Sequence, residues 1–138
     1  MKKKILVTGA DGFIGQHLCR YLIDKGYQVR GLYHENRPLY FISKQEIEWV
    51  KADLGDQSSI KHVTDSIDLI IHLAAIPRND LRKTWEDFQA VNVNGTNCLL
   101  NEAQKTGVKK FIFISTVEAA GYGDGINPRT EDDPPKPD

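Results

Sequence analysis

The 138-residue sequence has little cysteine and no long apolar run. Cys19 and Cys98 are its two cysteines, and no Cys-x-x-Cys pair or Cys/His cluster indicates a zinc site. We therefore expect two reduced, packed cysteines and no metal. No stretch approaches the roughly 20 apolar residues of a membrane span. The apolar run Ile5–Val7 behind the N-terminal lysines is shorter than the roughly 7–15 residues of a signal-peptide core, so we expect a cytoplasmic protein without a membrane partner.

The sequence also has almost no excess of charge of one sign, because it contains 18 Lys and Arg residues and 19 Asp and Glu residues. This balance gives no basic footprint for a nucleic-acid partner. A composition of 40% hydrophobic and 27% charged residues is typical of a soluble globular chain, and the length suits one domain.

The sequence does contain short apolar runs that alternate with segments whose apolar residues recur at helical intervals. The apolar runs predict five strands, at residues 3–8, 28–33, 47–51, 68–73 and 110–115. The segments between them predict helices at 12–25, 57–64 and 85–106, and a loop with one helical turn at 34–46. This alternation is typical of an α/β fold with a doubly wound parallel sheet, and five strands fit the order 3-2-1-4-5.

The last 18 residues differ in composition from the rest of the chain. Residues 121–138 hold four prolines, four aspartates and three glycines without strand or helix periodicity. We expect a Rossmann-type domain over residues 1–120, followed by a loop or disordered tail over 121–138.

The most informative segment is TGADGFIG, residues 8–15, between the first strand and the first helix. In this context Gly9 permits a tight turn, Gly12 lets the backbone approach a pyrophosphate, and Gly15 lets the helix pack closely on the sheet. The N-terminus of the helix points free N–H groups at the phosphates. The predicted cofactor-binding residues of this loop are Gly9, Asp11, Gly12, Phe13, Ile14 and Gly15. The alternative is a glycine-rich turn without a ligand.

This loop resembles the TGxxGxxG loop of the extended short-chain dehydrogenase/reductase family, which includes nucleotide-sugar epimerases, dehydratases and related reductases. Four later segments agree in order and spacing, and the resemblance covers nearly the whole chain. They are Asp53-Leu54, His72-Leu73-Ala74-Ala75, Asn92-Val93-Asn94-Gly95-Thr96, and Phe111–Thr116 followed by Gly121-Tyr122-Gly123.

The resemblance implies cofactor-binding roles outside the glycine loop. It places Asp53 and Leu54 beside the adenine, and the backbone of Leu73, Ala74 and Ala75 along the cofactor. It places Asn92 near the phosphates or the active-site backbone. Asp53 has the alternative role of capping the helix that follows, and Asn92 that of an exposed polar residue.

The end of the second predicted strand leaves the choice between NAD and NADP open. NAD-binding members usually place an acid there for the ribose 2′-hydroxyl, but Tyr33 occupies this position. His34 and Arg37 follow, with Arg30 close in sequence, and such cations would favour the 2′-phosphate of NADP. Glu35 would oppose it. We predict NAD or NADP, with NADP favoured.

The resemblance also implies where catalysis would occur. Family members use a Tyr-x-x-x-Lys pair as acid/base, and a Ser or Thr after the fifth strand to orient the substrate oxygen. Thr116, with Ser115 beside it, matches the second feature, although a turn cap is the alternative role. The matches Tyr21/Lys25 and Tyr40/Lys44 lie before the fifth strand, so we interpret them as chance. We expect the catalytic helix to follow Asp138 in a longer protein.

Two functional hypotheses result. The first is the cofactor-binding part of an NAD(P)-dependent epimerase, dehydratase or reductase that acts on a sugar nucleotide or a similar hydroxyl or carbonyl substrate, inactive as this chain alone. Thr116 favours it. The second is a non-catalytic sensor that binds a dinucleotide. Partners would be the dinucleotide and, in a longer protein, the small-molecule substrate. An unpaired fifth strand would also favour self-association into a homo-oligomer.

Overall fold

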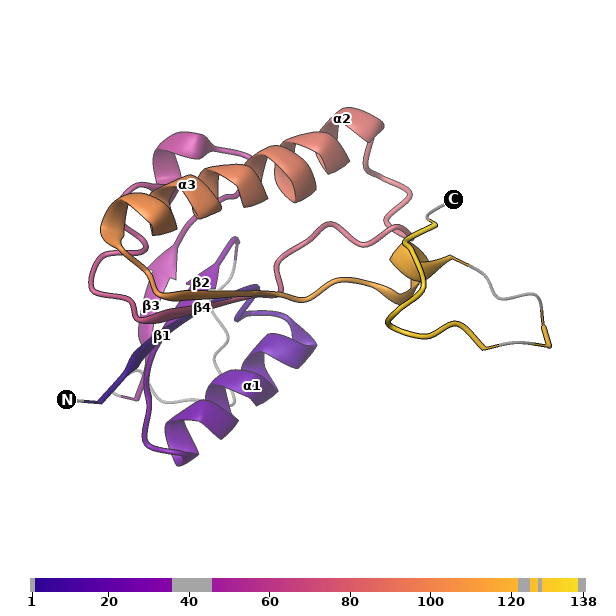
Figure 1. The fold of residues 1–138 in the computed structure, drawn as a ribbon. Helices are drawn as coiled ribbons and strands as arrows, with labels where there is room; N and C mark the ends of the chain where they lie inside the picture. The colour runs from indigo at the N-terminus through magenta and orange to yellow at the C-terminus, as the bar shows by residue number, and fades with distance from the viewer. Residues whose placement is uncertain (1, 36–45, 122–124, 127, 137–138) are drawn as a thin grey trace.

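A computed structural model describes residues 2–35, 46–121, 125–126 and 128–136 of the chain. They form one parallel sheet between two helical layers (Figure 1). The sheet order is β3-β2-β1-β4-β5, which confirms the predicted α/β fold and strand order. The strands are β1 (Lys4–Thr8), β2 (Gln28–Tyr33), β3 (Glu48–Lys51), β4 (Leu69–His72) and β5 (Lys110–Phe113).

One helical layer is α1 (Phe13–Asp24), and the other is dominated by a long helix over residues 85–106 (Figure 1). The long helix begins after Thr84, whose hydroxyl accepts from the backbone N–H of Asp87 while the Asp87 carboxylate accepts from the N–H of Thr84. It ends at Gly107, whose φ of +75° is left-handed. Both ends agree with the prediction.

The interior of this helix differs from the prediction. The helix comprises α2 (Trp85–Phe88), the π-helical segment η2 (Gln89–Gly95) and α3 (Thr96–Thr106). Hydrophobic spacing does not distinguish a π-helical segment from α-helix, so this segment could not be predicted from the pattern of apolar residues.

Two short 3₁₀ helices complete the described elements, η1 (Gln57–Ile60) and η3 (Val117–Ala120). The helix predicted over 57–64 is too long, because the chain turns after Ile60 and reaches a φ of 65° at His62. We did not predict η3. The described part of 121–138 contains no helix or strand.

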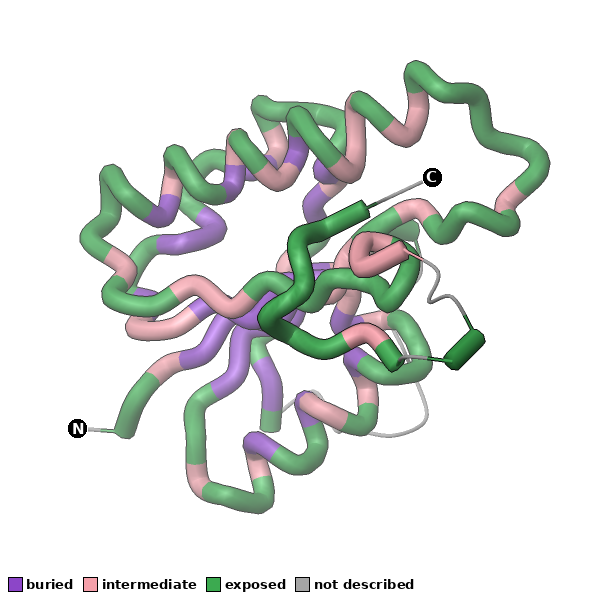
Figure 2. The backbone as a smooth tube through the Cα atoms, turned by 45° about the vertical axis from the view of Figure 1, so that its right-hand side comes forward, coloured by how far each residue is buried: buried purple, intermediate pink, exposed green. Residues whose placement is uncertain are grey.

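The two faces of the sheet bury separate apolar cores, because successive side chains of a strand point to opposite faces. Leu6 of β1 belongs to the core that includes Leu99 of α3. Its neighbours Ile5 and Val7 belong to the core that includes Cys19 of α1. All these side chains are at most 2% exposed, and the buried segments lie in the middle of the molecule (Figure 2). Full burial of each such aliphatic side chain contributes roughly 1.5–3 kcal/mol.

The two cysteines are free thiols. Cys19 is buried and Cys98 is half-buried. Burial raises the pKa of the Cys19 thiol to about 12, so the side chain acts as a packed apolar group rather than as a nucleophile.

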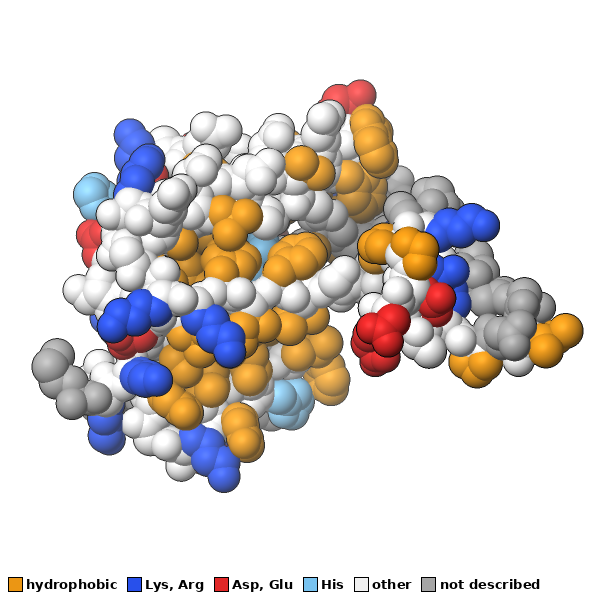
Figure 3. All heavy atoms as spheres, viewed as in Figure 1, with side chains coloured by type: hydrophobic (Ala, Val, Ile, Leu, Met, Phe, Trp, Pro, Cys, Tyr) orange, Lys and Arg blue, Asp and Glu red, His pale blue; other side chains and the backbone are white. Residues whose placement is uncertain are grey.

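β5 forms one edge of the described sheet. Phe113 at its end is 56% exposed, and Ile114 is 48% exposed. Hydrophobic side chains gather on the face above and below this edge (Figure 3). Apolar edges of this kind invite strand pairing, and self-association through β5 stays a prediction.

Candidate dinucleotide-binding site

A cleft of about 280 Å³ opens at the carboxyl ends of the strands. Its walls come from the ends of β1 and β2, the segments after β3 and β4, and η2. The strand order reverses between β1 and β4, and such switch points are the usual ligand sites of open α/β sheets. The lining residues are Thr8, Gly9, Asp11, Gly12, Leu32, Tyr33, His34, Ala52, Asp53, Leu54, Leu73, Ala74, Ala75, Ile76 and Val91.

Most residues predicted to bind a cofactor lie in this wall. They are Gly9, Asp11, Gly12, His34, Asp53, Leu54, Leu73, Ala74 and Ala75. Phe13 and Ile14 do not line it, and their side chains are 81% and 63% exposed. Only their backbone N–H groups are suited to a ligand at the start of α1. Arg37 lies outside the described residues.

The glycine loop brings the start of α1 against the end of β4. Gly9 has a φ of +64°, and a Cβ on it would lie 3.0 Å from the backbone N of Ala74. Gly12 is the N-cap of α1, and no side chain among the described residues caps the helix there. The N–H groups of the first turn are therefore left for a ligand, at the positive end of the helix dipole.

A buried polar chain ties the glycine loop to β4 and to the long helix. The ring of His72 lies between two hydroxyls, with Nδ1 2.6 Å from Thr8 Oγ1 and Nε2 2.8 Å from Thr96 Oγ1. Thr8 Oγ1 also accepts from the backbone N–H groups of Leu73 and Ala74, at 3.2 and 3.0 Å. Its own proton is therefore left to donate to His72 Nδ1.

The hydrogen-bond partners of His72 also determine its protonation state. With Nδ1 accepting, Nε2 carries the proton and donates to Thr96 Oγ1, which in turn donates to the backbone oxygen of Asn92. His72 is 1% exposed, and burial lowers the pKa of its ring to about 4. The ring is thus neutral and held in one tautomer. Thr8, His72 and Thr96 lie within the motifs but are not among the predicted site residues. Polar side chains within apolar segments are the signal that could have found them.

Asn92 fixes the segment after β4, although it does not line the cleft. Its Oδ1 accepts from the backbone N–H of Ile76 at 2.8 Å, and its Nδ2 donates to the oxygen of Ile76 at 3.0 Å. Both amide groups are therefore used by one wall residue of the cleft. Asn92 is not merely an exposed polar residue of the helix.

We expect the substitution Asn92→Leu to lower the free energy of unfolding by about 2 kcal/mol, because it leaves both backbone groups of Ile76 without their partner. Urea denaturation would measure this loss, and hydrogen exchange should show faster opening over residues 73–76. The exposed Asn101→Leu variant on the same long helix is the control and should change stability by less than about 0.5 kcal/mol. Equal losses in the two variants would contradict the role of Asn92.

Asp53 lies between the cleft and the turn that follows β3. Its Oδ1 accepts from the N–H of Gly55 at 2.8 Å, and its Oδ2 lies 3.3 Å from His34 Nε2. The cap of the following helix η1 is Asp56, which accepts from the N–H of Ser58. The alternative role of Asp53 as the cap of this helix is therefore wrong.

Ser115 and Thr116 lie after β5, are exposed, and are not part of the cleft wall. Thr116 Oγ1 accepts from the N–H of Glu118 at 3.3 Å and caps η3. The hydroxyl thus serves as a turn cap in this chain, and its role toward a substrate stays a prediction.

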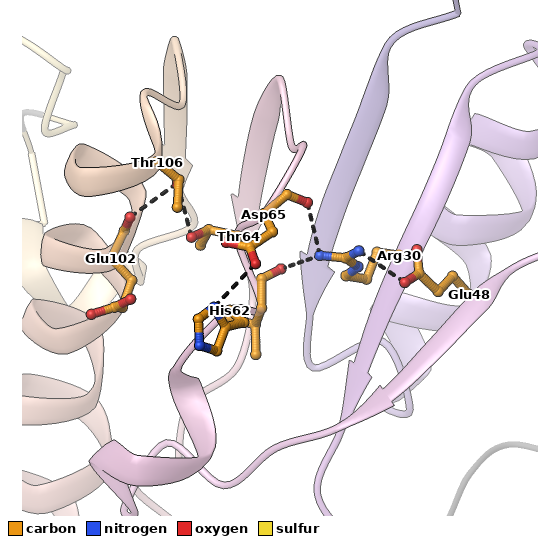
Figure 4. A network of polar contacts seen from close by, with 8 residues as sticks. Arg30, Glu48, His62, Thr64, Asp65, Glu102 and Thr106 are labelled. Carbon is orange, nitrogen blue, oxygen red and sulfur yellow. Dashed lines mark hydrogen bonds and ion pairs between the residues drawn. The ribbon is translucent and has the colours of Figure 1, made fainter.

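Arg30 does not belong to a phosphate pocket, contrary to the expectation from its place in the sequence. It is 9% exposed and donates to the backbone oxygens of Val63 and Asp65, at 2.8 and 3.1 Å. Its Nη2 lies 2.8 Å from Glu48 Oε1 (Figure 4). Because β2 is buried, the long side chain extends along the sheet to these partners instead of entering the cleft.

Among the described residues, no three His, Cys, Asp or Glu side chains are grouped so that they could hold a metal ion. No helix in the described ranges is long and apolar enough to cross a membrane.

Comparison with known families identifies the kind of protein that has this cleft. The NAD dependent epimerase/dehydratase family matches residues 5–138. The chain belongs to this family.

Individual relatives add detail to the match. The UDP-N-acetyl-alpha-D-glucosaminuronate decarboxylase of Bacillus cytotoxicus is 36% identical over 96% of the chain and 42% of its own length. The 3 beta-hydroxysteroid dehydrogenase/Delta 5-->4-isomerase of Mycobacterium tuberculosis is 34% identical over 89% of the chain and 34% of its own length. A uronate dehydrogenase variant from Agrobacterium tumefaciens, solved with NAD, superposes with a TM-score of 0.82 at 27% identity, covering 100% of the chain and 50% of that protein. The chain thus spans half or less of the length of these proteins.

Proposed function

We propose that the chain is the cofactor-binding part of an NAD(P)-dependent epimerase, dehydratase or reductase that acts on a sugar nucleotide or a similar hydroxyl or carbonyl substrate. The observation that carries the proposal is the start of α1 with no side-chain cap, which faces a cleft at the switch point of the sheet. Membership of the family supports the cofactor, and the UDP-sugar named for the Bacillus relative supports the substrate class.

The residues of the cleft fit the parts of a dinucleotide. The pyrophosphate would lie over Gly12 and the first N–H groups of α1, where Gly12 leaves open the space that a side chain would fill. The adenine would lie against Leu54 beside Asp53, and the nicotinamide half would extend along the segment of Ala75. When bound, the nicotinamide supplies hydride transfer. Thr116 would orient the substrate oxygen through its hydroxyl, which accepts from the N–H of Glu118 and keeps its own proton to donate.

Binding of ADP-ribose tests the proposed pyrophosphate site without requiring catalysis. We expect the chain to bind ADP-ribose in a calorimetric titration. The Gly12→Ala variant should weaken this binding about tenfold, equivalent to 1.4 kcal/mol, because its methyl group keeps the pyrophosphate from the backbone. Adenosine, which has no phosphate, is the control ligand. The Gly12→Ala variant should bind adenosine almost as tightly as the unmodified chain does. Failure of the unmodified chain to bind ADP-ribose, or equal binding by the variant, would refute the proposed site.

A further inference from the structure

The carboxylate of Asp11 lies at the end of β2, although Asp11 belongs to the glycine loop. Its Oδ2 accepts from the backbone N–H of His34 at 3.1 Å. His34 directly follows Tyr33, the last residue of β2, and all three residues line the cleft. The chain thus has an acid at the end of this strand, supplied by another segment.

A second carboxylate stands close to the first. The ring of His34 lies 3.3 Å from Asp53 Oδ2, while its backbone N–H is bound to Asp11. His34 therefore links two acids of the cleft wall. A ligand group at this corner meets two carboxylates and one imidazole.

Two of the described arginines, Arg30 and Arg82, are engaged away from this corner. Arg30 is buried against Val63 and Asp65. Arg82 forms two hydrogen bonds to the carboxylate of Asp80, at 2.9 and 3.1 Å. Among the described residues, the wall of the cleft contains no Lys or Arg. The two carboxylates suit the corner to a hydroxyl donor, and the described residues of its wall offer no Lys or Arg to an anion.

We propose that Asp11 selects a dinucleotide with a free ribose 2′-hydroxyl, and so makes the site specific for NAD. The inference rests on the proposed function, because it assumes that the adenosine half enters this cleft. The 2′-hydroxyl donates to the Asp11 carboxylate, as it does to the acid that usually ends this strand. The 2′-phosphate of NADP would instead meet the charges of Asp11 and Asp53. This proposal is the opposite of the NADP preference that the sequence neighbours of Tyr33 favour.

The test compares ADP-ribose with 2′-phospho-ADP-ribose, which differ only in the group that Asp11 would contact. We expect the chain to bind ADP-ribose at least about tenfold more tightly. The Asp11→Asn variant keeps an oxygen for the N–H of His34 but removes the charge, and should reduce this ratio by about tenfold, mainly by binding the phosphorylated ligand better.

The Asp24→Asn variant is the matched control. It makes the same chemical change at the last residue of α1, eleven positions after the start of this 12-residue helix. This lies beyond the Debye length of about 8 Å at 0.15 M ionic strength, so its ratio should equal that of the unmodified chain. An unchanged ratio in Asp11→Asn, or tighter binding of the phosphorylated ligand by the unmodified chain, would overturn the inference alone. Binding of neither ligand would overturn the proposed function with it.

Discussion

The substitution Gly15→Ala should strongly destabilise the folded chain. A Cβ at position 15 would lie 2.0 Å from the backbone oxygen of Gly9 and 2.8 Å from the Cα of Ala10. These are backbone atoms at the end of β1, so no side chain can turn aside to make room. The overlap forces α1 away from the sheet and opens the core around Cys19. We expect a loss of about 3 kcal/mol or more, at the upper end of overpacking effects.

Gly12→Ala is the matched control, because it adds the same methyl group three residues earlier in the same loop. Its Cβ would lie 3.3 Å from the same oxygen of Gly9, a contact that a small shift relieves. Its φ of −76° suits any residue. Urea denaturation of both variants should therefore show a small loss for Gly12→Ala, below about 1 kcal/mol, and a large one for Gly15→Ala. Similar midpoints would show that α1 does not pack on the loop as described.

The fold could be predicted from the sequence because each strand has its own apolar run, which can be recognised without knowledge of the other strands. Runs such as Ile5–Val7 are apolar on both faces, as strands between two helical layers must be, and Gly9 marks the turn after this first run. The bounds predicted for the long helix from its apolar spacing also agree with the structure, in which it begins after Thr84 and ends at Gly107. The π-helical segment η2 could not be predicted, because it depends on close packing: a Cβ on Gly95 would lie 2.6 Å from the backbone oxygen of Leu54.

The candidate site was predictable in its motifs but not in its hydrogen bonds. The glycine loop and the segment after β4 have recognisable spacing, and both line the cleft. Sequence neighbours suggested a cationic corner at the end of β2, but the direction of a long side chain is set by tertiary packing, and Arg30 turns toward Val63. Asp11 reaches that corner from a segment 23 positions away in the sequence. No local pattern contains that contact.

The buried ring of His72 should make the stability of the domain depend on pH. Its pKa is lowered from 6.5 to about 4 in the folded protein by burial, whereas the unfolded chain keeps the ordinary value. Between these values the unfolded chain binds the extra proton. The stabilisation is therefore fully present above about pH 6.5 and is lost as the pH falls toward 4, by about 3 kcal/mol in total.

The hydrogen bonds of His72 disfavour the protonated ring, as its burial does. Protonation would place a second N–H against Thr8 Oγ1, which already accepts from Leu73 and Ala74. One buried donor would then lack an acceptor. Loss of this contact would release the glycine loop from the segment after β4, so ADP-ribose binding should weaken over the same pH range.

Comparison with His72→Asn isolates this contribution from that of the carboxylates. The Asn oxygen can accept the Thr8 hydroxyl, but the amide does not titrate. Urea denaturation of both proteins from pH 7.5 to 4.5 should show the advantage of the unmodified chain shrinking by about 2 kcal/mol, because the common acidic groups cancel in the difference. If the variant does not fold, NMR of the His72 ring in the unmodified chain answers the same question, since the ring should stay neutral down to about pH 5. A ring that titrates near 6.5 would show that His72 is not held in the buried chain between Thr8 and Thr96.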